Sequence, residues 1–146
     1  MTRARRAAID LPADIEQGML AWAYACHPEE ACGLLAGLPG GGLRMAYPLT
    51  NAQHSPTRYT IDPTEHFRAL RHAERQGWEL VGAFHSHPDG EASPSETDVR
   101  LAAEPDWLYV VIGMADARRP SVRAFHIRSG SVTEVELVRS VERSAR

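Results

Sequence analysis

An apolar run that ends in two histidines restricts the possible fold more than any other feature of this sequence. The run from Leu80 to Ser86 predicts a buried central strand. The residues that follow, His87 to Pro94, are rich in proline, glycine and acidic side chains and predict a loop. Because side chains alternate between the two faces of a strand, His85 and His87 leave the same face and can meet at one point.

The patterns on either side of this run predict a mixed order of helices and strands. Helical spacing of apolar residues indicates one helix, Asp62-Pro63-Thr64-Glu65 is a strong start for a second, and Ser95 opens a third. The helices are expected at 12–26, 62–77 and 95–103, and the other strands at 31–38, 43–49, 58–61, 106–114, 122–127 and 132–138. This order predicts an α/β fold in which helices flank a mixed central sheet.

The chain is long enough for one ordinary domain. Its 146 residues are 43% hydrophobic and 24% charged, which is the balance of a globular protein with a substantial core. We expect a single domain over residues 10–138, with flexible termini at 1–9 and 139–146. Cys26 and Cys32 are too few for a disulfide scaffold or a zinc ribbon, and the sequence leaves open whether they pair.

Charge and hydropathy argue against several classes of partner. The formal net charge of −3 provides no general attraction to nucleic acid or to an anionic membrane. The sequence contains no apolar run of roughly eighteen residues, so no membrane span is expected. The basic start lacks the apolar segment of a secretory signal, and a cytoplasmic protein is the default expectation.

The two histidines and a nearby carboxylate have the composition of an open zinc site, which leaves one position for water. Asp98 is the natural carboxylate, because the loop and helix start before it can fold it back over the strand end. Zinc lowers the pKa of its water to about 7, and a base must then take the proton. Glu29 or Glu30 could be that base, and the Ser95 hydroxyl could donate to the oxyanion that forms.

Each of these signals also has an ordinary structural interpretation. An isolated His-x-His pair is weak evidence for a metal. Ser95-x-x-Asp98 is also a plain helix capping box. Glu29 and Glu30 follow Pro28 and could be solvated turn residues. The co-occurrence of all these residues in one short chain favours the metal site.

Other metal-binding folds fit the sequence less well. His85-x-His87 with Glu91 matches half of a cupin signature, but the flanking glycines are missing and the helices argue against an all-β barrel. Nucleobase deaminases need a Pro-Cys-x-x-Cys motif that is absent. Barrel hydrolases with a His-x-His pair need about 250 residues. A His-Glu-x-x-His helix is also absent.

Two motifs resemble those of the JAMM (MPN+) zinc metalloprotease family. One is His85-Ser86-His87-Pro88, followed after six residues by Ser95-x-x-Asp98. The other is Glu30-Ala31-Cys32-Gly33-Leu34-Leu35, which resembles the family's E-x-C-G-L-L strand. Both occur in the family's order and at compatible separation. The predicted elements also suit the cytidine-deaminase-like MPN fold of this family over residues 10–138.

The resemblance implies a role for each residue. His85, His87 and Asp98 would bind one zinc ion per chain. Glu30 would be the general acid/base, and Ser95 would assist the tetrahedral intermediate. Members of the family are peptidases or isopeptidases that cleave after the C-terminal Gly-Gly of ubiquitin or of ubiquitin-like sulfur-carrier proteins. A short stand-alone prokaryotic member is expected to act on a sulfur carrier, such as those of molybdopterin, thiamine or cysteine synthesis.

Two alternative functions remain at this stage. One is a catalytically silent interaction scaffold of the same fold, although such scaffolds lack one or more of the five site residues that are present here. The other is a zinc amidase that acts on a small molecule, with the same site chemistry and a different groove. An extended Gly-Gly tail could pair with a sheet edge, for which the hairpin over 31–49 and the segment 51–61 are the candidates.

Overall fold

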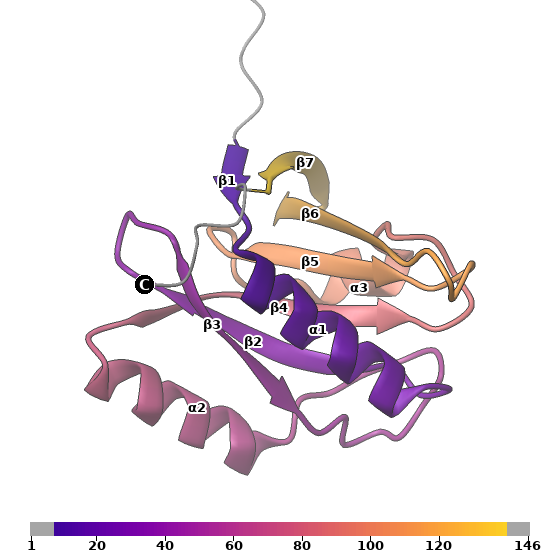
Figure 1. The fold of residues 1–146 in the computed structure, drawn as a ribbon, viewed down its shortest axis with the longest axis horizontal. Coiled ribbons are helices and arrows are strands. Elements are labelled where there is room, and N and C mark those ends of the chain that lie inside the picture. The colour runs from indigo at the N-terminus through magenta and orange to yellow at the C-terminus, as the bar shows by residue number, and fades with distance from the viewer. Residues whose placement is uncertain (1–7, 140–146) are drawn as a thin grey trace, which may run out of the picture.

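Residues 8–139, the part of the chain that the computed structural model describes, form seven strands and three helices (Figure 1). In chain order these are β1 (Ala8–Asp10), α1 (Ala13–Cys26), β2 (Cys32–Gly37), β3 (Leu43–Leu49), α2 (Pro63–Arg75), β4 (Glu79–His87), α3 (Glu96–Leu101), β5 (Leu108–Gly113), β6 (Ser121–Arg128) and β7 (Ser131–Val138). Most of the predicted flexible termini, residues 1–7 and 140–146, lie outside the described residues.

The strands form one mixed sheet in the order β1-β7-β6-β5-β4-β2-β3. The pairs β1–β7 and β4–β5 are parallel, and the other neighbouring strands are antiparallel. The predicted mixed α/β arrangement is therefore confirmed. Strand β4, which contains the apolar run, lies inside the sheet between β5 and β2, as its composition predicts.

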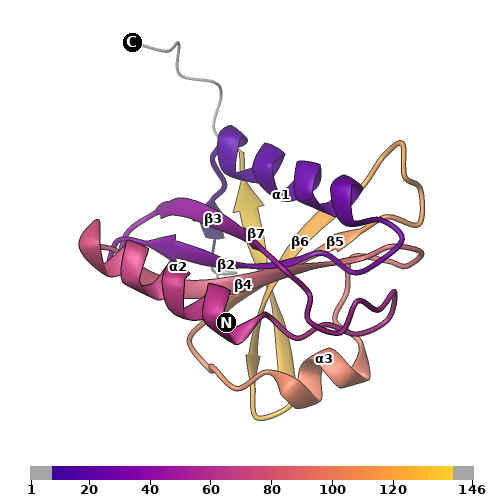
Figure 2. The ribbon, with the colours of Figure 1, turned by 90° about the horizontal axis from the view of Figure 1, so that it is seen from below.

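Helices lie on both faces of the sheet, with α1 on one side and α2 and α3 on the other (Figure 2). On the first side, Ile15 and Met19 of α1 share a core with Phe84. On the second side, Ala69 of α2 shares a core with Ala83. The sheet is therefore buried on both faces near β4, which explains why the middle of that strand, from Leu80 to Phe84, is apolar.

Side-chain alternation along β4 directs its two histidines toward the face that carries α2 and α3. Phe84 packs on the α1 side and Ala83 on the α2 side. Because successive side chains point to opposite faces, His85 and His87 share the side of Ala83. Val99 of α3 packs over β5 in a cluster on this same side. The strand period predicted from the sequence therefore places both imidazoles beside α3.

The prediction of a strand over 58–61 is wrong. Ile61 forms only an isolated bridge with Asn51. The Asn51 side chain takes the place of a strand ladder, because its Nδ2 donates to the Arg58 carbonyl at 2.9 Å and its Oδ1 accepts from the Thr60 N–H at 3.2 Å. These backbone groups are satisfied by a side chain, so the segment stays a loop beside the sheet.

The sequence pattern does not reveal the first strand, β1, which pairs in parallel with β7. Three residues are too few for an alternation signal. The predicted flexible segment 1–9 therefore overlaps this strand at Ala8 and Ile9. At the other end of the domain, Arg139 forms an ion pair with Glu16, with 2.8 Å between Nη2 and Oε2.

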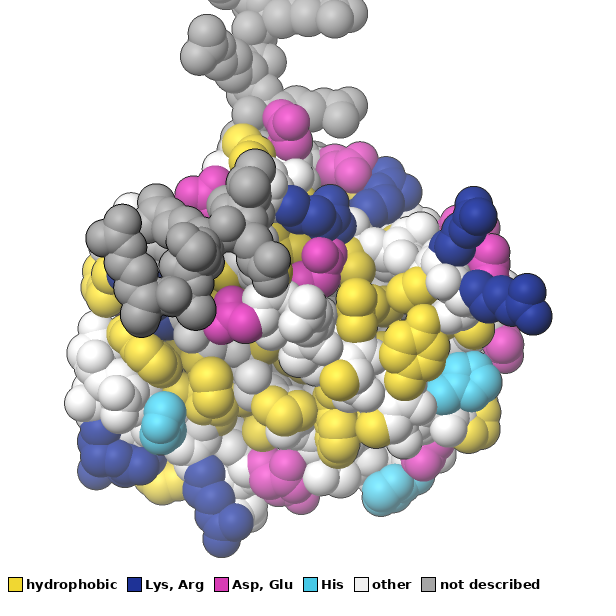
Figure 3. Space-filling view, viewed as in Figure 1, with side chains coloured by type: hydrophobic (Ala, Val, Ile, Leu, Met, Phe, Trp, Pro, Cys, Tyr) yellow, Lys and Arg dark blue, Asp and Glu magenta, His cyan; other side chains and the backbone are white. Residues whose placement is uncertain are grey.

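The surface, the helices and the cysteines of residues 8–139 bear on the remaining expectations from the sequence. On the face drawn in Figure 3, acidic and basic side chains are interspersed with apolar ones. Within residues 8–139, no helix is both long and apolar enough to cross a membrane. Cys26 and Cys32 are free thiols, and Cys32 is buried in β2.

Candidate metal centre

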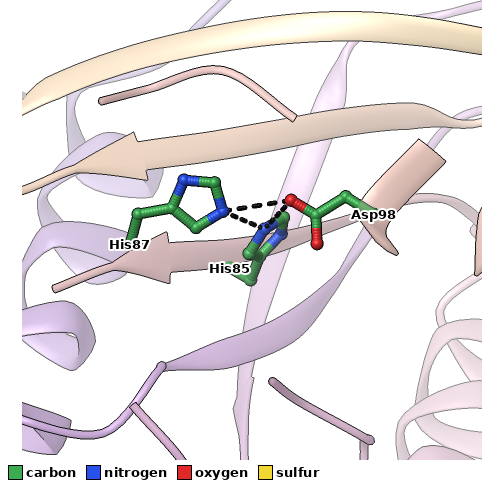
Figure 4. Close-up of side chains that lie close together, drawn as sticks. All are labelled: His85, His87 and Asp98. Atoms are coloured by element: carbon green, nitrogen blue, oxygen red, sulfur yellow. Dashed lines mark hydrogen bonds and ion pairs between the residues drawn. The ribbon is translucent and has the colours of Figure 1, made fainter. Parts of the chain in front are cut away.

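His85, His87 and Asp98 converge on one point at the end of β4 (Figure 4). The Nε2 atoms of His85 and His87 are 3.0 Å apart, and each lies 3.0 Å from Asp98 Oδ2. His85 is buried, with 3% of its surface exposed, and the other two are partly exposed toward solvent. The structure therefore brings together the three residues that the sequence indicates as metal ligands.

Asp98 reaches this point because it belongs to the capping box of α3. Ser95 Oγ accepts from the Asp98 N–H at 3.0 Å, and the Ser95 N–H donates to Asp98 Oδ2 at 2.8 Å. The same oxygen, Oδ2, faces both histidines. The capping box, which competes with the metal interpretation in the sequence, is therefore the device that aims the carboxylate at His85 and His87.

The arrangement of these atoms fits a zinc ion. His87 Nδ1 lies 2.9 Å from the Glu91 carbonyl, which can only accept, so Nδ1 carries the proton and Nε2 is left bare. The three ligand atoms form a triangle with sides of 3.0 Å. Ligands of tetrahedral zinc, at bond lengths of about 2.0–2.1 Å, lie about 3.3 Å apart. A small expansion of the triangle is enough to hold the ion.

The electrostatics of the cluster favour the ligand forms of Asp98 and His85. Burial lowers the pKa of His85 and outweighs its hydrogen bond to Asp98. Burial also acts to lower the pKa of His87, but hydrogen bonds to Asp98 and the Glu91 carbonyl raise it overall. Burial alone would raise the pKa of Asp98, yet its interactions with the rings of His85 and His87 and with the Ser95 N–H hold it well below its usual range. Asp98 is therefore ionised and His85 neutral near neutral pH.

Glu30 is a buried carboxyl that lies just before β2. It is 4% exposed, and its Oε1 has no hydrogen-bond partner within residues 8–139. Burial raises the pKa of Glu30 to about 7, while the charge of His87 lowers it and that of Asp98 raises it. Glu29, in contrast, is partly exposed and pairs with His54 at 3.1 Å. The structure thus separates the two glutamates that the sequence leaves open as candidate bases.

Two polar side chains that the sequence analysis overlooks hold Glu30 in place. Ser86 Oγ accepts from the Ala31 N–H at 2.8 Å, which joins the residue after Glu30 to the histidine strand. Asn51 Nδ2 donates to the Glu30 carbonyl at 3.1 Å. Ser86 lies between the two histidines and points to the opposite face. These long-range contacts leave no local sequence signal.

Tyr59 is a further neighbour of the centre that sequence reasoning misses. Its ring stacks on the imidazole of His85, with 4.6 Å between the ring centroids and 23° between the planes. The loop that carries Tyr59 is shaped by Asn51 rather than by a strand ladder. A pattern-based expectation of a strand at this position could not place the ring against His85.

The sequence profile of the prokaryotic homologues of the JAB domain matches residues 12–128, which include the whole candidate centre. This chain belongs to that family. The resemblance to the JAMM/MPN+ family that the two sequence motifs indicate is thereby confirmed.

Two relatives of this JAB-domain protein carry peptidase or protease names. The CysO-cysteine peptidase of Mycobacterium tuberculosis is 43% identical over 123 residues, which cover 84% of each chain. The probable TtuB-protein conjugate cleaving protease of Thermus thermophilus is 39% identical over 114 residues, which cover 76% of this chain and 69% of that one. With the family match, these likenesses identify the chain as a hydrolytic enzyme of the JAMM type.

Solved structures agree with this assignment. A protein from Desulfitobacterium hafniense superimposes with a TM-score of 0.84 at 37% identity, over 93% of this chain and 95% of that one. A JAB1/MPN domain protein from Archaeoglobus fulgidus superimposes with a TM-score of 0.59 at 20% identity, over 90% of this chain and 98% of that one. The second likeness concerns the fold alone, and it confirms the predicted MPN fold class.

Proposed function

We propose that this protein is a zinc-dependent peptidase that cleaves after the C-terminal Gly-Gly of a sulfur-carrier or ubiquitin-like protein. His85, His87 and Asp98 hold one zinc ion per chain. The observation that carries the proposal is the triangle of ligand atoms, 3.0 Å on each side, in a centre that also contains the buried carboxyl of Glu30. The names of the Mycobacterium and Thermus relatives support a substrate of this class.

The side chains around the centre have the properties that peptide hydrolysis requires. Bound zinc supplies Lewis acidity that brings the pKa of a water to about 7. Glu30, whose pKa burial raises to about 7, takes a proton from the attacking water and returns it to the leaving amine. Ser95 Oγ accepts from the Asp98 N–H, so its own hydrogen is free to donate to the carbonyl oxygen as that atom gains charge.

A groove beside Asp98 provides a path for the substrate tail. It has a volume of about 380 Å³ and lies between the loop 53–60 and α3, and Tyr109 of β5 also lines it. A Gly-Gly tail has no side chains, so it can thread a narrow groove and pair through its backbone with a neighbouring segment. Of the two edges that the sequence indicates, the segment 51–61 lines this groove and is the one we favour.

The proposal is tested with a carrier protein fused through its C-terminal Gly-Gly to a second protein. We expect the zinc-loaded wild type to cleave after the second glycine, as mass spectrometry of the products would show. Glu30→Gln should slow cleavage by about 10²–10⁴-fold, because the proton transfer is lost. Glu29→Gln is the matched control, since Glu29 lies on the surface, and it should cleave like wild type.

Two results would contradict the proposal. One is the absence of cleavage across a panel of such carriers, and the other is equal cleavage by Glu30→Gln and wild type. The alternative of a small-molecule amidase predicts that a short Gly-Gly amide is cleaved as efficiently as the fused carrier. The proposal predicts a clear preference for the carrier, because most of the tail's contacts lie along the groove.

A further inference from the structure

Two arginines line the groove beside the candidate metal centre, one from each segment that forms it. Arg58 belongs to the loop 53–60, and Arg100 belongs to α3. Both side chains are exposed to solvent. Within residues 8–139, neither guanidinium forms an ion pair or a hydrogen bond. The groove therefore presents two cationic groups that form no ion pair among the described residues, although Glu96 lies one turn before Arg100 on α3.

The remaining charged residue of the groove, Asp98, does not offset these arginines. Its Oδ2 faces His85 and His87 and accepts from the Ser95 N–H. A metal ion at this point would neutralise the carboxylate further. Two of the three charged side chains that line the groove are therefore cationic, although the whole chain has a formal net charge of −3. Cationic side chains in a groove favour a bound segment that carries negative charge, whatever the net charge of the whole protein.

The backbone positions of both arginines are fixed relative to the centre. The Arg58 carbonyl accepts from Asn51 Nδ2 at 2.9 Å, and the next residue, Tyr59, stacks on His85. Arg100 follows Asp98 by two positions on α3, which is about 3 Å along the helix axis. Both side chains are exposed, but the backbone position from which each extends is fixed close to the proposed metal ligands.

The spacing indicates which part of a tail these arginines meet. An extended chain advances about 3.3 Å per residue, so two glycines occupy about 7 Å from the scissile bond. Each arginine side chain is long enough to carry its guanidinium along the groove away from the metal ligands, so we place the two groups beyond the glycines. The residues third and fourth from the bond are therefore the first whose side chains can reach Arg58 and Arg100.

We propose that Arg58 and Arg100 select tails that carry Asp or Glu at the third or fourth residue before the scissile bond, and that they disfavour tails with Lys or Arg there. This inference rests on the proposed function. Exposed ion pairs are individually weak. The arginines attract an acidic tail and repel a basic one, however, so both effects widen the difference in affinity between the two tails. An acidic tail should therefore be preferred over a basic tail by about tenfold in kcat/KM at low ionic strength, and the preference should shrink at high salt.

Three fusion substrates test this selection, identical except for two acidic, two neutral or two basic residues immediately before Gly-Gly. Wild type should cleave them in the order acidic, neutral, basic. The variant Arg58→Glu/Arg100→Glu should reverse the order, and Arg58→Gln/Arg100→Gln should abolish it. Arg71→Glu, an exposed arginine on α2 outside the groove, is the matched control and should keep the wild-type order.

A binding measurement separates this inference from the proposed function. Free peptides with the same three tails, ending in the Gly-Gly carboxylate, are titrated into wild type and the charge-reversed variant and followed by fluorescence anisotropy. If no fusion is cleaved but the acidic peptide binds more tightly and the variant reverses this, the proposed function fails while the selection by charge stands. Cleavage or binding without a charge preference, or a preference that Arg71→Glu changes equally, would overturn the inference.

Discussion

The ring of Tyr59 lies against the imidazole of His85, with centroids 4.6 Å apart. Through this contact, a loop that lacks regular structure packs against the ring of a proposed metal ligand. The contact explains how a buried histidine keeps the orientation in which its Nε2 meets His87 and Asp98. Outer contacts of this kind contribute substantially to metal affinity.

Removal of the Tyr59 ring should therefore weaken metal binding. We expect Tyr59→Ala to lower zinc affinity by about 10–100-fold, whereas Tyr59→Phe keeps the ring and stays near wild type. Competition with a chromophoric chelator measures the affinity. Tyr24→Ala, at an exposed tyrosine of α1, is the control. Equal affinities for Tyr59→Ala and wild type would show that the stacking has no role in holding His85.

The buried carboxyl of Glu30 should make the stability of the metal-free protein depend on pH. Its folded pKa, about 7, lies above the usual value of 4.5, so the folded state holds the proton more tightly. The associated stability is complete below about pH 4.5 and is lost as pH rises through about 7. Glu30→Gln cannot ionise and should be more stable than wild type at pH 8, by roughly 1–3 kcal/mol, but not at pH 4.5.

Urea unfolding of the chelator-treated proteins at the two pH values measures this difference. The difference between the free energies of unfolding of the two proteins at each pH removes the contribution of every other titrating group. Glu29→Gln should follow wild type, since Glu29 lies on the surface. If Glu30→Gln and wild type change in parallel with pH, Glu30 is not a buried carboxyl of raised pKa.

Asn51 should be important for stability because it satisfies four backbone groups. Its amide nitrogen donates to the carbonyls of Glu30 and Arg58, and its oxygen accepts from the N–H groups of Gln53 and Thr60. Asn51→Ala leaves these groups without partners and should lower the free energy of unfolding by about 2–4 kcal/mol.

The control for this prediction is Gln53→Ala, which removes only an exposed hydrogen bond to Thr60 Oγ1. It should change the free energy of unfolding by about 0.5 kcal/mol or less. Asn51→Asp should be at least as damaging as Asn51→Ala at neutral pH, because its carboxylate would face the carbonyls of Glu30 and Arg58. A loss below about 1 kcal/mol in Asn51→Ala would contradict the assignment of Asn51 as the organiser of the loop.

Measurements of stability and of kcat separate the capping of α3 by Ser95 from its proposed catalytic role. As the N-cap of α3 it contributes about 1 kcal/mol, and Ser95→Ala should lose that stability. As a donor to the carbonyl oxygen it should raise kcat, so Ser95→Ala should lower kcat by about 10²–10³-fold. Ser95→Thr keeps a hydroxyl and should retain most of both properties. A Ser95→Ala enzyme of normal kcat would restrict Ser95 to its capping function.

The features that the sequence predicts correctly depend on short-range patterns. The period of a strand places His85 and His87 on one face, and the Ser95-x-x-Asp98 spacing predicts a helix start that the structure contains. The Asp62 cap and the Gly-rich turn between β2 and β3 are likewise local. In each case, neighbouring residues in the chain determine the geometry.

The features that escape prediction depend on contacts between distant segments. Asn51 satisfies the backbone around Arg58 with its side chain, so the alternating apolar residues there form a loop and not a strand. The position of Tyr59 against His85 follows from that loop. Strand β1 needs β7 as its partner and is too short to show a period. None of these pairings can be read from one segment alone.

The zinc environment in the purified protein shows whether His85, His87 and Asp98 hold the ion. X-ray absorption at the zinc edge reports the ligand types and their distances. We expect about one zinc per chain, bound by two imidazole nitrogens and oxygen atoms at about 2.0–2.2 Å, with no sulfur. His87→Ala should lose this signal. A sulfur shell at about 2.3 Å, which would implicate Cys26 or Cys32, or a zinc content that His87→Ala leaves unchanged, would contradict the account.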